Sequence, residues 1–240
     1  MSTERRAGMA ARSGLPSLLP LALILAACSD AASEPNFPQP DRPVAPIVST
    51  RYSNEDSRDS AGEAETVMHL SRVAPGMTVA DIGAGEGYYT VRLAPLVGED
   101  GRVLAQDIMP ETRDRLAERV QREALDNVSV KLGEPDDPKL PPASFDRIFM
   151  VHMYHEIEQP YAFLWHMRPA LKRGGSVVVV DADRPTANHG TPPRLLVCEF
   201  AAVGYKLVRF EDLPAAEAYL AQFVAKGERP QPDSIRACQG

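Results

Sequence analysis

Cysteine is scarce in this sequence, with three among 240 residues. Three cysteines can form neither the dense disulfide framework of a small secreted scaffold nor a four-cysteine zinc site, although the count still allows one pair. Basic residues are not in excess either, because 26 Lys and Arg stand against 33 Asp and Glu. This balance excludes a broad basic surface that binds nucleic acid through its phosphates. Since hydrophobic residues make up 44% of the chain, we expect one globular domain whose core depends on packing.

The N-terminal segment has no apolar run long enough to span a membrane. Its run covers residues 15–27, contains two prolines, and is shorter than the roughly 20 residues that a spanning helix needs. Three arginines precede the run, and small residues end it before Cys28. Basic residues, a short apolar run and a small-residue end are the pattern of a secretory signal peptide. We therefore assign residues 1–27 to a signal peptide.

The end of this segment, Leu25-Ala26-Ala27-Cys28, resembles the lipobox of bacterial lipoproteins. The resemblance implies that the mature chain starts at an acylated Cys28 and is anchored in the membrane at the periplasmic face of the cell envelope. Ser29 favours the outer membrane by the same analogy. The alternatives are an ordinary signal peptide before a chance cysteine, or a wrongly chosen start codon; the alternative location is the cytoplasm.

Proline is concentrated after the predicted signal peptide, with five prolines between residues 35 and 46. Proline blocks both helices and the interior of a sheet. We predict a proline-rich tether over residues 28–50, a folded domain over 51–228 and a C-terminal tail over 229–240. In an oxidising compartment Cys198 and Cys238 can pair. The alternative is a buried free Cys198 with a disordered tail.

From about Arg58 onward, short β-branched runs alternate with longer amphipathic segments. This pattern predicts a three-layer α/β sandwich, in which helices cover both faces of a mostly parallel, Rossmann-like sheet. Seven strands are expected, over residues 78–82, 102–107, 128–132, 145–151, 176–181, 205–211 and 219–224, with clear helices over 110–125 and 160–171. The last two strands are joined by a segment too short for a parallel crossover, so the last strand should be antiparallel to its neighbours.

A glycine-rich loop follows the first predicted strand, where Gly83, Gly85 and Gly87 precede a helix. Glycines at such a turn let the backbone approach a ligand closely. Their spacing is G-x-G-x-G rather than the G-x-G-x-x-G of dinucleotide-binding loops. Asp81, two residues before the first glycine, would also repel a pyrophosphate. A dehydrogenase is therefore disfavoured.

Two more carboxylates follow the next two strands. Asp107 ends the second strand, where a carboxylate can accept both hydroxyls of a ribose, and Glu134 follows the third. Since the carboxyl ends of parallel strands meet at one edge of a sheet, we expect these groups to surround one crevice. The structural alternatives are a turn carboxylate at Asp81 and a solvated strand end at Asp107.

Taken in order, these motifs resemble those of class I S-adenosylmethionine-dependent methyltransferases, from about residue 58 to residue 224. Residues 144–148 are similar to the family's entry to the fourth strand, and residues 171–175 to its L-K-P-G-G turn, with Arg173 in place of the proline. The resemblance implies S-adenosylmethionine as cofactor, and contacts to it from Asp81, Gly83, Ala84, Gly85, Gly87, Asp107, Ile108 and Glu134. Glu134 departs from the family's usual Asp. Residues 75–103 also look somewhat like protein isoaspartyl methyltransferases.

The same resemblance implies that the end of the fourth strand faces the transferred methyl group. Here the chain is rich in titratable groups, and we assign His152, Tyr154 and His155 to the acceptor side as bases or substrate ligands, with Glu156 available to orient a histidine. The alternatives are a helix-capping histidine, a tyrosine packed in the core and a solvated glutamate.

A metal site is the competing hypothesis for this stretch. It would use His152, His155 and Glu156, with His166 or His189 as a further ligand. The histidine spacing is not the i, i+4 pair of a helical zinc site, and no cysteine accompanies it, so no metal is expected. The loop that contains His189, after the fifth strand, is either a substrate-specificity loop or a solvated connector.

We therefore predict an enzyme that transfers a methyl group from S-adenosylmethionine to an acceptor, more readily a small molecule than a protein. Export conflicts with this activity, because the cofactor is made in the cytoplasm. Arg5-Arg6 is a partial match to a twin-arginine signal, which exports folded proteins. Otherwise the segment tethers a cytoplasmic domain to the inner membrane, or the fold serves as a non-catalytic ligand-binding lipoprotein.

Overall fold

The structure is a computed structural model that describes residues 35–47 and 55–239. The predicted signal peptide, Cys28 and the ends of the predicted tether lie outside these residues. Among the residues described, no helix has the length and apolar character needed to cross a membrane.

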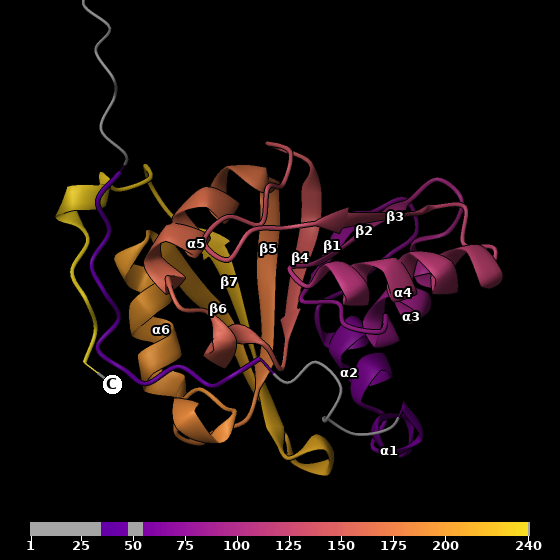
Figure 1. The fold of residues 1–240 in the computed structure, drawn as a ribbon, viewed down its shortest axis with the longest axis horizontal. Helices are drawn as coiled ribbons and strands as arrows, with labels where there is room; N and C mark the ends of the chain where they lie inside the picture. The colour runs from indigo at the N-terminus through magenta and orange to yellow at the C-terminus, as the bar shows by residue number, and fades with distance from the viewer. Residues whose placement is uncertain (1–34, 48–54, 240) are drawn as a thin grey trace, which may run out of the picture. The chain divides into compact units, whose positions relative to one another are not determined.

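The centre of the domain is a seven-stranded sheet (Figure 1). Its strands are β1 (Thr78–Ile82), β2 (Arg102–Asp107), β3 (Val128–Leu132), β4 (Phe145–Val151), β5 (Leu171–Asp181), β6 (Tyr205–Leu213) and β7 (Ala218–Ala225). They lie in the order β3-β2-β1-β4-β5-β7-β6, and β7 runs antiparallel to both β5 and β6. The predicted fold class and the antiparallel last strand are confirmed.

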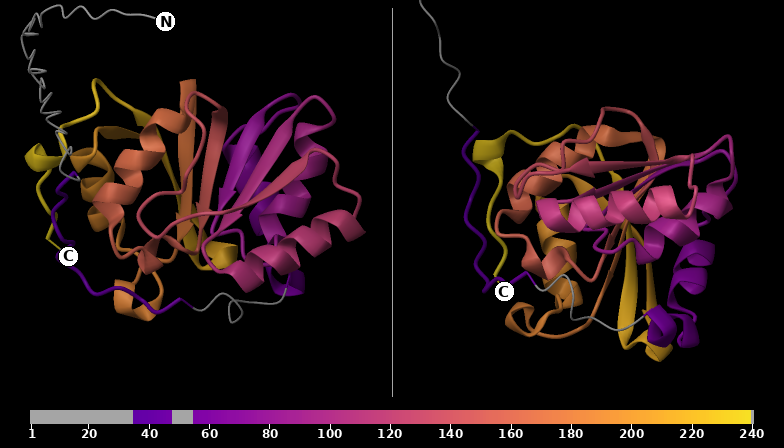
Figure 2. Two further views of the ribbon diagram at one scale, coloured as in Figure 1. Left: turned by 45° about the horizontal axis from the view of Figure 1, so that its top comes forward. Right: turned by 45° about the vertical axis from the view of Figure 1, so that its right-hand side comes forward.

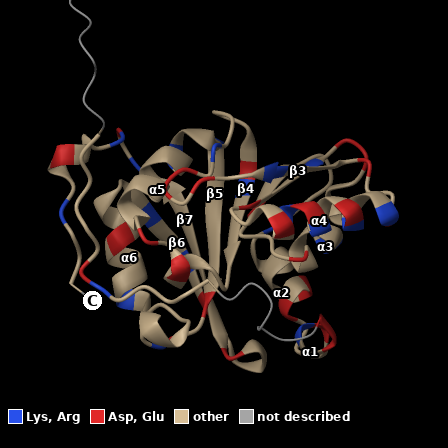
Figure 3. Cartoon of the chain, viewed as in Figure 1, with Lys and Arg blue, Asp and Glu red and all other residues tan. Residues whose placement is uncertain are grey.

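In the part of the chain that the structure describes, helices α2 to α6 pack on the two faces of this sheet, and α1, which has no buried residue, packs against α2 (Figure 2). They are α1 (Glu55–Ser60), α2 (Glu63–Leu70), α3 (Tyr88–Val97), α4 (Pro110–Arg122), α5 (Pro160–Met167) and α6 (Pro193–Ala202). Successive side chains of a strand point to opposite faces, so Val79 packs in the core beneath α2 and α3 while Ala80 packs beneath α5 and α6. Charged residues lie mainly on helices and loops, and the central strands are largely uncharged (Figure 3).

Residues 35–47, predicted to belong to a tether, lie against the folded domain. Arg42 is buried and its Nε donates a hydrogen bond to Glu199 Oε1 at 2.9 Å. The Ala45 N–H donates to the His155 carbonyl at 3.1 Å, and Asp41 forms a β-bridge with Gln239. Proline keeps this segment out of helix and sheet, as expected, but side-chain and main-chain bonds still attach it to the domain.

The C-terminal tail is also attached. Cys238 forms a disulfide with Cys198 of α6, which confirms the predicted pair. The Cys238 N–H donates to the Tyr161 hydroxyl at 2.7 Å, and Ile235 is buried. The tail therefore closes over α5 and α6.

We expect the Cys238→Ser variant to lose roughly 2–4 kcal/mol of unfolding free energy, because the disulfide closes a loop with a sequence separation of 40 residues. Urea unfolding followed by circular dichroism measures this loss. Dithiothreitol should lower the stability of the unsubstituted protein by a similar amount and leave the Cys198→Ser/Cys238→Ser protein unchanged. Equal stability of oxidised and reduced protein would contradict the prediction.

Candidate functional site

A cavity of about 290 Å³ opens at the carboxyl edge of the sheet. Its walls come from the loop after β1, the end of β2, the segment after β4, and α1. Because β1, β2 and β4 are parallel, their carboxyl ends meet at this edge. The crevice predicted from the sequence is therefore present.

The glycine loop forms one wall of the cavity. Gly85 has φ +56°, and a Cβ added to it would meet no atom within 4 Å, so its open side faces the space that a ligand can occupy. Gly87, at the N-terminus of α3, has φ +89°, and its added Cβ would lie 2.5 Å from Leu116 Cδ1. Gly83 and Ala84 also line the cavity. The loop thus needs glycine at Gly87 for packing and at Gly85 for backbone conformation and access.

Asp107 is held at the cavity wall by two backbone groups. Its Oδ2 accepts the Gly85 N–H at 3.0 Å, and its Oδ1 accepts the Met109 N–H at 2.9 Å. These bonds fix the carboxylate while each oxygen keeps a further lone pair. Asp107 and Ile108 both line the cavity, as the sequence predicted. A fixed carboxylate of this kind can accept two neighbouring hydroxyls of a ribose.

Gln106 is a cavity residue that the sequence analysis missed. Its side chain is only 1% exposed and lines the cavity, and its Nε2 has no hydrogen-bond partner among the described residues. A buried amide without an acceptor is costly, so a ligand that offers an acceptor at this point fits the site. The available signal was a glutamine that directly follows the apolar residues 103–105 of β2.

Asp81 lies beneath the glycine loop and is not among the residues lining the cavity. It is buried, and its Oδ2 accepts a 2.6 Å hydrogen bond from Thr90 Oγ1 of α3. Burial raises the pKa of Asp81 to about 6, although the bond from Thr90 acts in the opposite direction. The structure therefore gives Asp81 a place supporting the loop, instead of the direct cofactor contact implied by the resemblance.

Glu134 also lies apart from the cavity lining. It is exposed in the turn after β3 and forms an ion pair with Lys139 at 3.1 Å. The next residue, Pro135, lines the cavity instead. The adenine contact of Glu134 that the resemblance implies therefore stays a prediction.

His152 lines the cavity at the end of β4, as predicted. Its φ of +52° is unusual for a residue with a side chain, and its Nε2 lies 3.2 Å from Glu63 Oε2 on α2. Glu63 also accepts hydrogen bonds from Arg58 at 2.6 Å and from the Tyr89 hydroxyl at 3.0 Å. Residues with a strained backbone cluster at functional sites. The strained His152 is held by the buried carboxylate of Glu63, which the sequence analysis did not single out.

The pKa of Glu63 is lowered to about 2 in this cluster. Burial alone would raise it, but the hydrogen bonds and charges of His152 and Arg58 outweigh burial. The unfolded chain therefore takes up a proton near pH 4.5, before the folded protein does, so the contribution of Glu63 to stability is present above that pH and is lost as the pH falls toward about 2.

We expect the Glu63→Gln variant to remove this acid dependence, which amounts to on the order of 3 kcal/mol for such a shift. Urea unfolding at several pH values between about 4.5 and about 2 measures the slope. The exposed Glu65→Gln variant on the same helix is the control and should keep the slope of the unsubstituted protein. Parallel curves for Glu63→Gln and the control would show that Glu63 is not the group responsible.

Tyr154 does not reach the cavity, which corrects its predicted place on the acceptor side. It begins the 3₁₀ turn η1 (Tyr154–Glu156), is fully buried, and donates a 2.7 Å hydrogen bond to Glu199 Oε2 of α6. Burial is the main cause that raises its pKa far above the ordinary value. The physical reason is the turn at η1, which directs this ring into the core beside Phe200.

His155 points away from the cavity as well. It is buried, and its Nδ1 lies 3.0 Å from Asp181 Oδ1 at the end of β5. The neighbouring Glu156 lines the cavity, and His189 lies beside both. Of the side chains considered for a metal site, the structure thus brings together His155, Glu156 and His189. His152 and His166 are not part of this group.

Comparison with known proteins agrees with the fold and the glycine loop. Residues 79–175 match the family described as a methyltransferase domain. A protein-L-isoaspartate O-methyltransferase of Methanococcoides burtonii is 29% identical over 110 residues, covering 46% of this chain and 51% of the relative. A ubiquinone/menaquinone biosynthesis C-methyltransferase of Teredinibacter turnerae is 31% identical over 122 residues, covering 49% and 48%. The crystal structure of a SAM-dependent methyltransferase from Aquifex aeolicus is 25% identical with a TM-score of 0.65, covering 70% of this chain and 92% of that one.

The chain therefore contains a class I S-adenosylmethionine-dependent methyltransferase domain with the Rossmann-like sheet of that class. It spans about half the length of the curated relatives it matches. The resemblance to isoaspartyl methyltransferases predicted from the sequence is found, over no more than half of the chain. One relative is named for O-methylation and the other for C-methylation, so these matches leave the acceptor open.

Proposed function

We propose that this protein transfers the methyl group of S-adenosylmethionine to a small-molecule acceptor. The observation that carries the proposal is the Asp107 carboxylate, fixed by the Gly85 and Met109 N–H groups beside the open side of Gly85. The unpartnered Nε2 of Gln106 at the same wall supports it, because a nucleoside offers acceptors. The residues present thus fit the cofactor.

The bound cofactor would supply a methyl group activated by its sulfonium. Asp107 would hold the ribose hydroxyls, and the backbone at Gly85 would allow close approach of the ligand. Alignment of donor and acceptor by such fixed groups provides most of the acceleration in a transfer of this kind.

On the acceptor side, His152 is the cavity residue best placed to take up a proton. Its Nε2 faces Glu63, which would stabilise the imidazolium that forms. Arg58 lines the cavity next to it, with its guanidinium 3.8 Å from the centre of the Tyr88 ring.

We also propose that the protein is anchored in the bacterial cell envelope through an acylated Cys28. The motif Leu25-Ala26-Ala27-Cys28 after a short apolar run supports this. Metabolic labelling with an alkyne fatty acid tests it. The label should appear in the unsubstituted protein and be absent from the Cys28→Ala variant, and equal labelling of both would contradict the anchor.

The experiment that tests the enzymatic proposal is titration of the full-length protein with S-adenosylmethionine and S-adenosylhomocysteine by calorimetry, followed by an acceptor screen with methyl-labelled cofactor. Binding of both ligands with transfer to at least one acceptor supports the proposal. If the folded protein binds neither ligand, the enzymatic proposal is refuted.

A further inference from the structure

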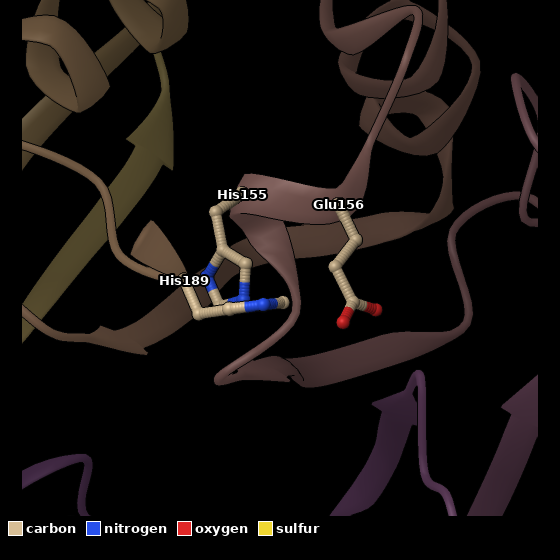
Figure 4. A group of neighbouring side chains, drawn as sticks. All are labelled: His155, Glu156 and His189. Carbon is tan, nitrogen blue, oxygen red and sulfur yellow. The ribbon is translucent and has the colours of Figure 1, made fainter. Parts of the chain in front are cut away.

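Three side chains of the kind that bind metal ions gather behind the cavity. His155 and Glu156 lie on η1 after β4, and His189 follows the 3₁₀ turn η3 (Thr186–Asn188) after β5 (Figure 4). The ligand atoms that they offer all lie within 4.8 Å of one another. Because β4 and β5 are neighbouring parallel strands, the turns at their carboxyl ends meet at this point.

One of the two histidines is oriented as a metal ligand would be. Asp181 is fully buried and accepts from the Nδ1–H of His155, from Thr191 Oγ1 at 2.7 Å and from the Ala182 N–H. This arrangement leaves the Nε2 of His155 with a lone pair. Metal-binding histidines are commonly held in this way, by a carboxylate on the opposite ring nitrogen.

The Nε2 of His155 is the second, independent observation. The side chain is 1% exposed, and this nitrogen has no hydrogen-bond partner among the described residues. A buried nitrogen with a free lone pair is costly unless something occupies it. The ring lies at 87° to that of His189, with 5.5 Å between their centres. The unsatisfied group thus lies in the same cluster as the other two ligand side chains.

We propose that His155, Glu156 and His189 bind one divalent transition-metal ion. Two imidazoles and one carboxylate suit zinc, iron or cobalt, whereas magnesium and calcium prefer oxygen ligands. Ligand atoms on one zinc ion lie roughly 3.4 Å apart, so separations of up to 4.8 Å would have to shorten on binding. This proposal departs from the sequence analysis, which expected no metal.

The backbone around the cluster is secured from a distant segment. The Ala45 N–H donates to the His155 carbonyl at 3.1 Å, and Thr186 Oγ1 donates to the Pro43 carbonyl at 2.7 Å. Both turns are therefore attached to the segment of residues 35–47. His189 has φ +56°, a conformation that costs energy for a residue with a side chain. Rigid support of this kind is what a ligand set needs to hold its geometry.

Glu156 also lines the cavity, so an ion bound here would lie next to the space in which an acceptor is proposed to bind. A hydroxyl or thiol of the acceptor that coordinates the ion would lose its proton more readily, with the proton passing to a base such as His152 or to water. This consequence rests on the proposed function, whereas the metal site itself does not.

Metal binding to the full-length protein, without a polyhistidine tag and after removal of ions by a chelator, tests the proposal. We expect calorimetry to show one Zn²⁺ per chain, and Co²⁺ to give visible absorption bands of a site with nitrogen ligands. His189→Ala and His155→Ala should weaken binding by more than about 100-fold, and Asp181→Asn by about 10- to 100-fold. His69→Ala, which changes an exposed histidine of α2, should bind as the unsubstituted protein does.

Circular dichroism shows whether each variant is folded, and His189→Ala carries the test if His155→Ala is not. Absence of stoichiometric binding in the unsubstituted protein, or equal affinity in folded His189→Ala, would overturn the site. Titration with S-adenosylhomocysteine separates this result from the proposed function. If the protein binds the metal but not S-adenosylhomocysteine, the metal site is supported and the enzymatic proposal is refuted. If it binds S-adenosylhomocysteine but not the metal, the metal site is refuted and the enzymatic proposal stands.

Discussion

Asp107→Ala should weaken binding of S-adenosylmethionine and S-adenosylhomocysteine by roughly 2–3 kcal/mol, which is about 30- to 150-fold. The substitution removes an ionised acceptor from the cavity wall, and hydrogen bonds to charged groups are the strong ones. It also frees the Gly85 and Met109 N–H groups that now hold the loop. Calorimetric titration of the full-length variant measures the loss.

Two controls separate loss of the ribose acceptor from general damage. Asp107→Asn loses the charge and keeps an acceptor oxygen for only one of the two backbone N–H groups. Its binding should therefore fall between that of the unsubstituted protein and that of Asp107→Ala. Asp126→Ala removes an exposed carboxylate before the start of β3, at the opposite edge of the sheet, and should bind normally. If Asp107→Ala binds as Asp126→Ala does, Asp107 does not hold the cofactor.

Glu199→Ala should be the most destabilising single change, at about 3–5 kcal/mol, because it leaves a buried charge without its partner. Glu199 is fully buried on α6 and accepts from Arg42 at 2.9 Å and from the Tyr154 hydroxyl at 2.7 Å. The guanidinium of Arg42 stays protonated, so removal of the Glu199 carboxylate would leave a buried positive charge in apolar surroundings. Urea unfolding followed by circular dichroism measures the change.

The double variant Arg42→Met/Glu199→Leu tests this explanation, since apolar residues of similar size can replace a buried ion pair at little cost. We expect it to be more stable than Glu199→Ala. The same comparison reports on residues 35–47, because Arg42 joins them to α6. Were Glu199→Ala as stable as the double variant, the ion pair would not hold this segment.

Local patterns in the sequence were sufficient for the fold and for the glycine loop at the cavity. The β-branched runs and amphipathic stretches predicted all seven strands, because their periods follow from the geometry of strands and helices. The short link before β7 predicted its direction, because a chain of that length cannot cross a sheet. Asp107 was found because strand ends in a parallel sheet meet at one edge.

Only the tertiary structure decided which side chains after β4 face the cavity. His152 does, while Tyr154 and His155 turn into the protein, because the positive φ of His152 and the turn at η1 change the direction of the chain within four residues. No periodic pattern applies to so short an irregular stretch. Its side-chain directions depend on packing against other elements.

The partners of these groups also come from distant parts of the chain. Glu63 reaches His152 from α2, and Asp181 reaches His155 from β5. A sequence shows that such carboxylates exist, but contacts between residues 89 or 26 positions apart depend on how the elements pack. The sequence by itself thus determined the fold class and the strand-end carboxylate at the cavity, and folding decided which side chains after β4 line that cavity and which join the histidine cluster behind it.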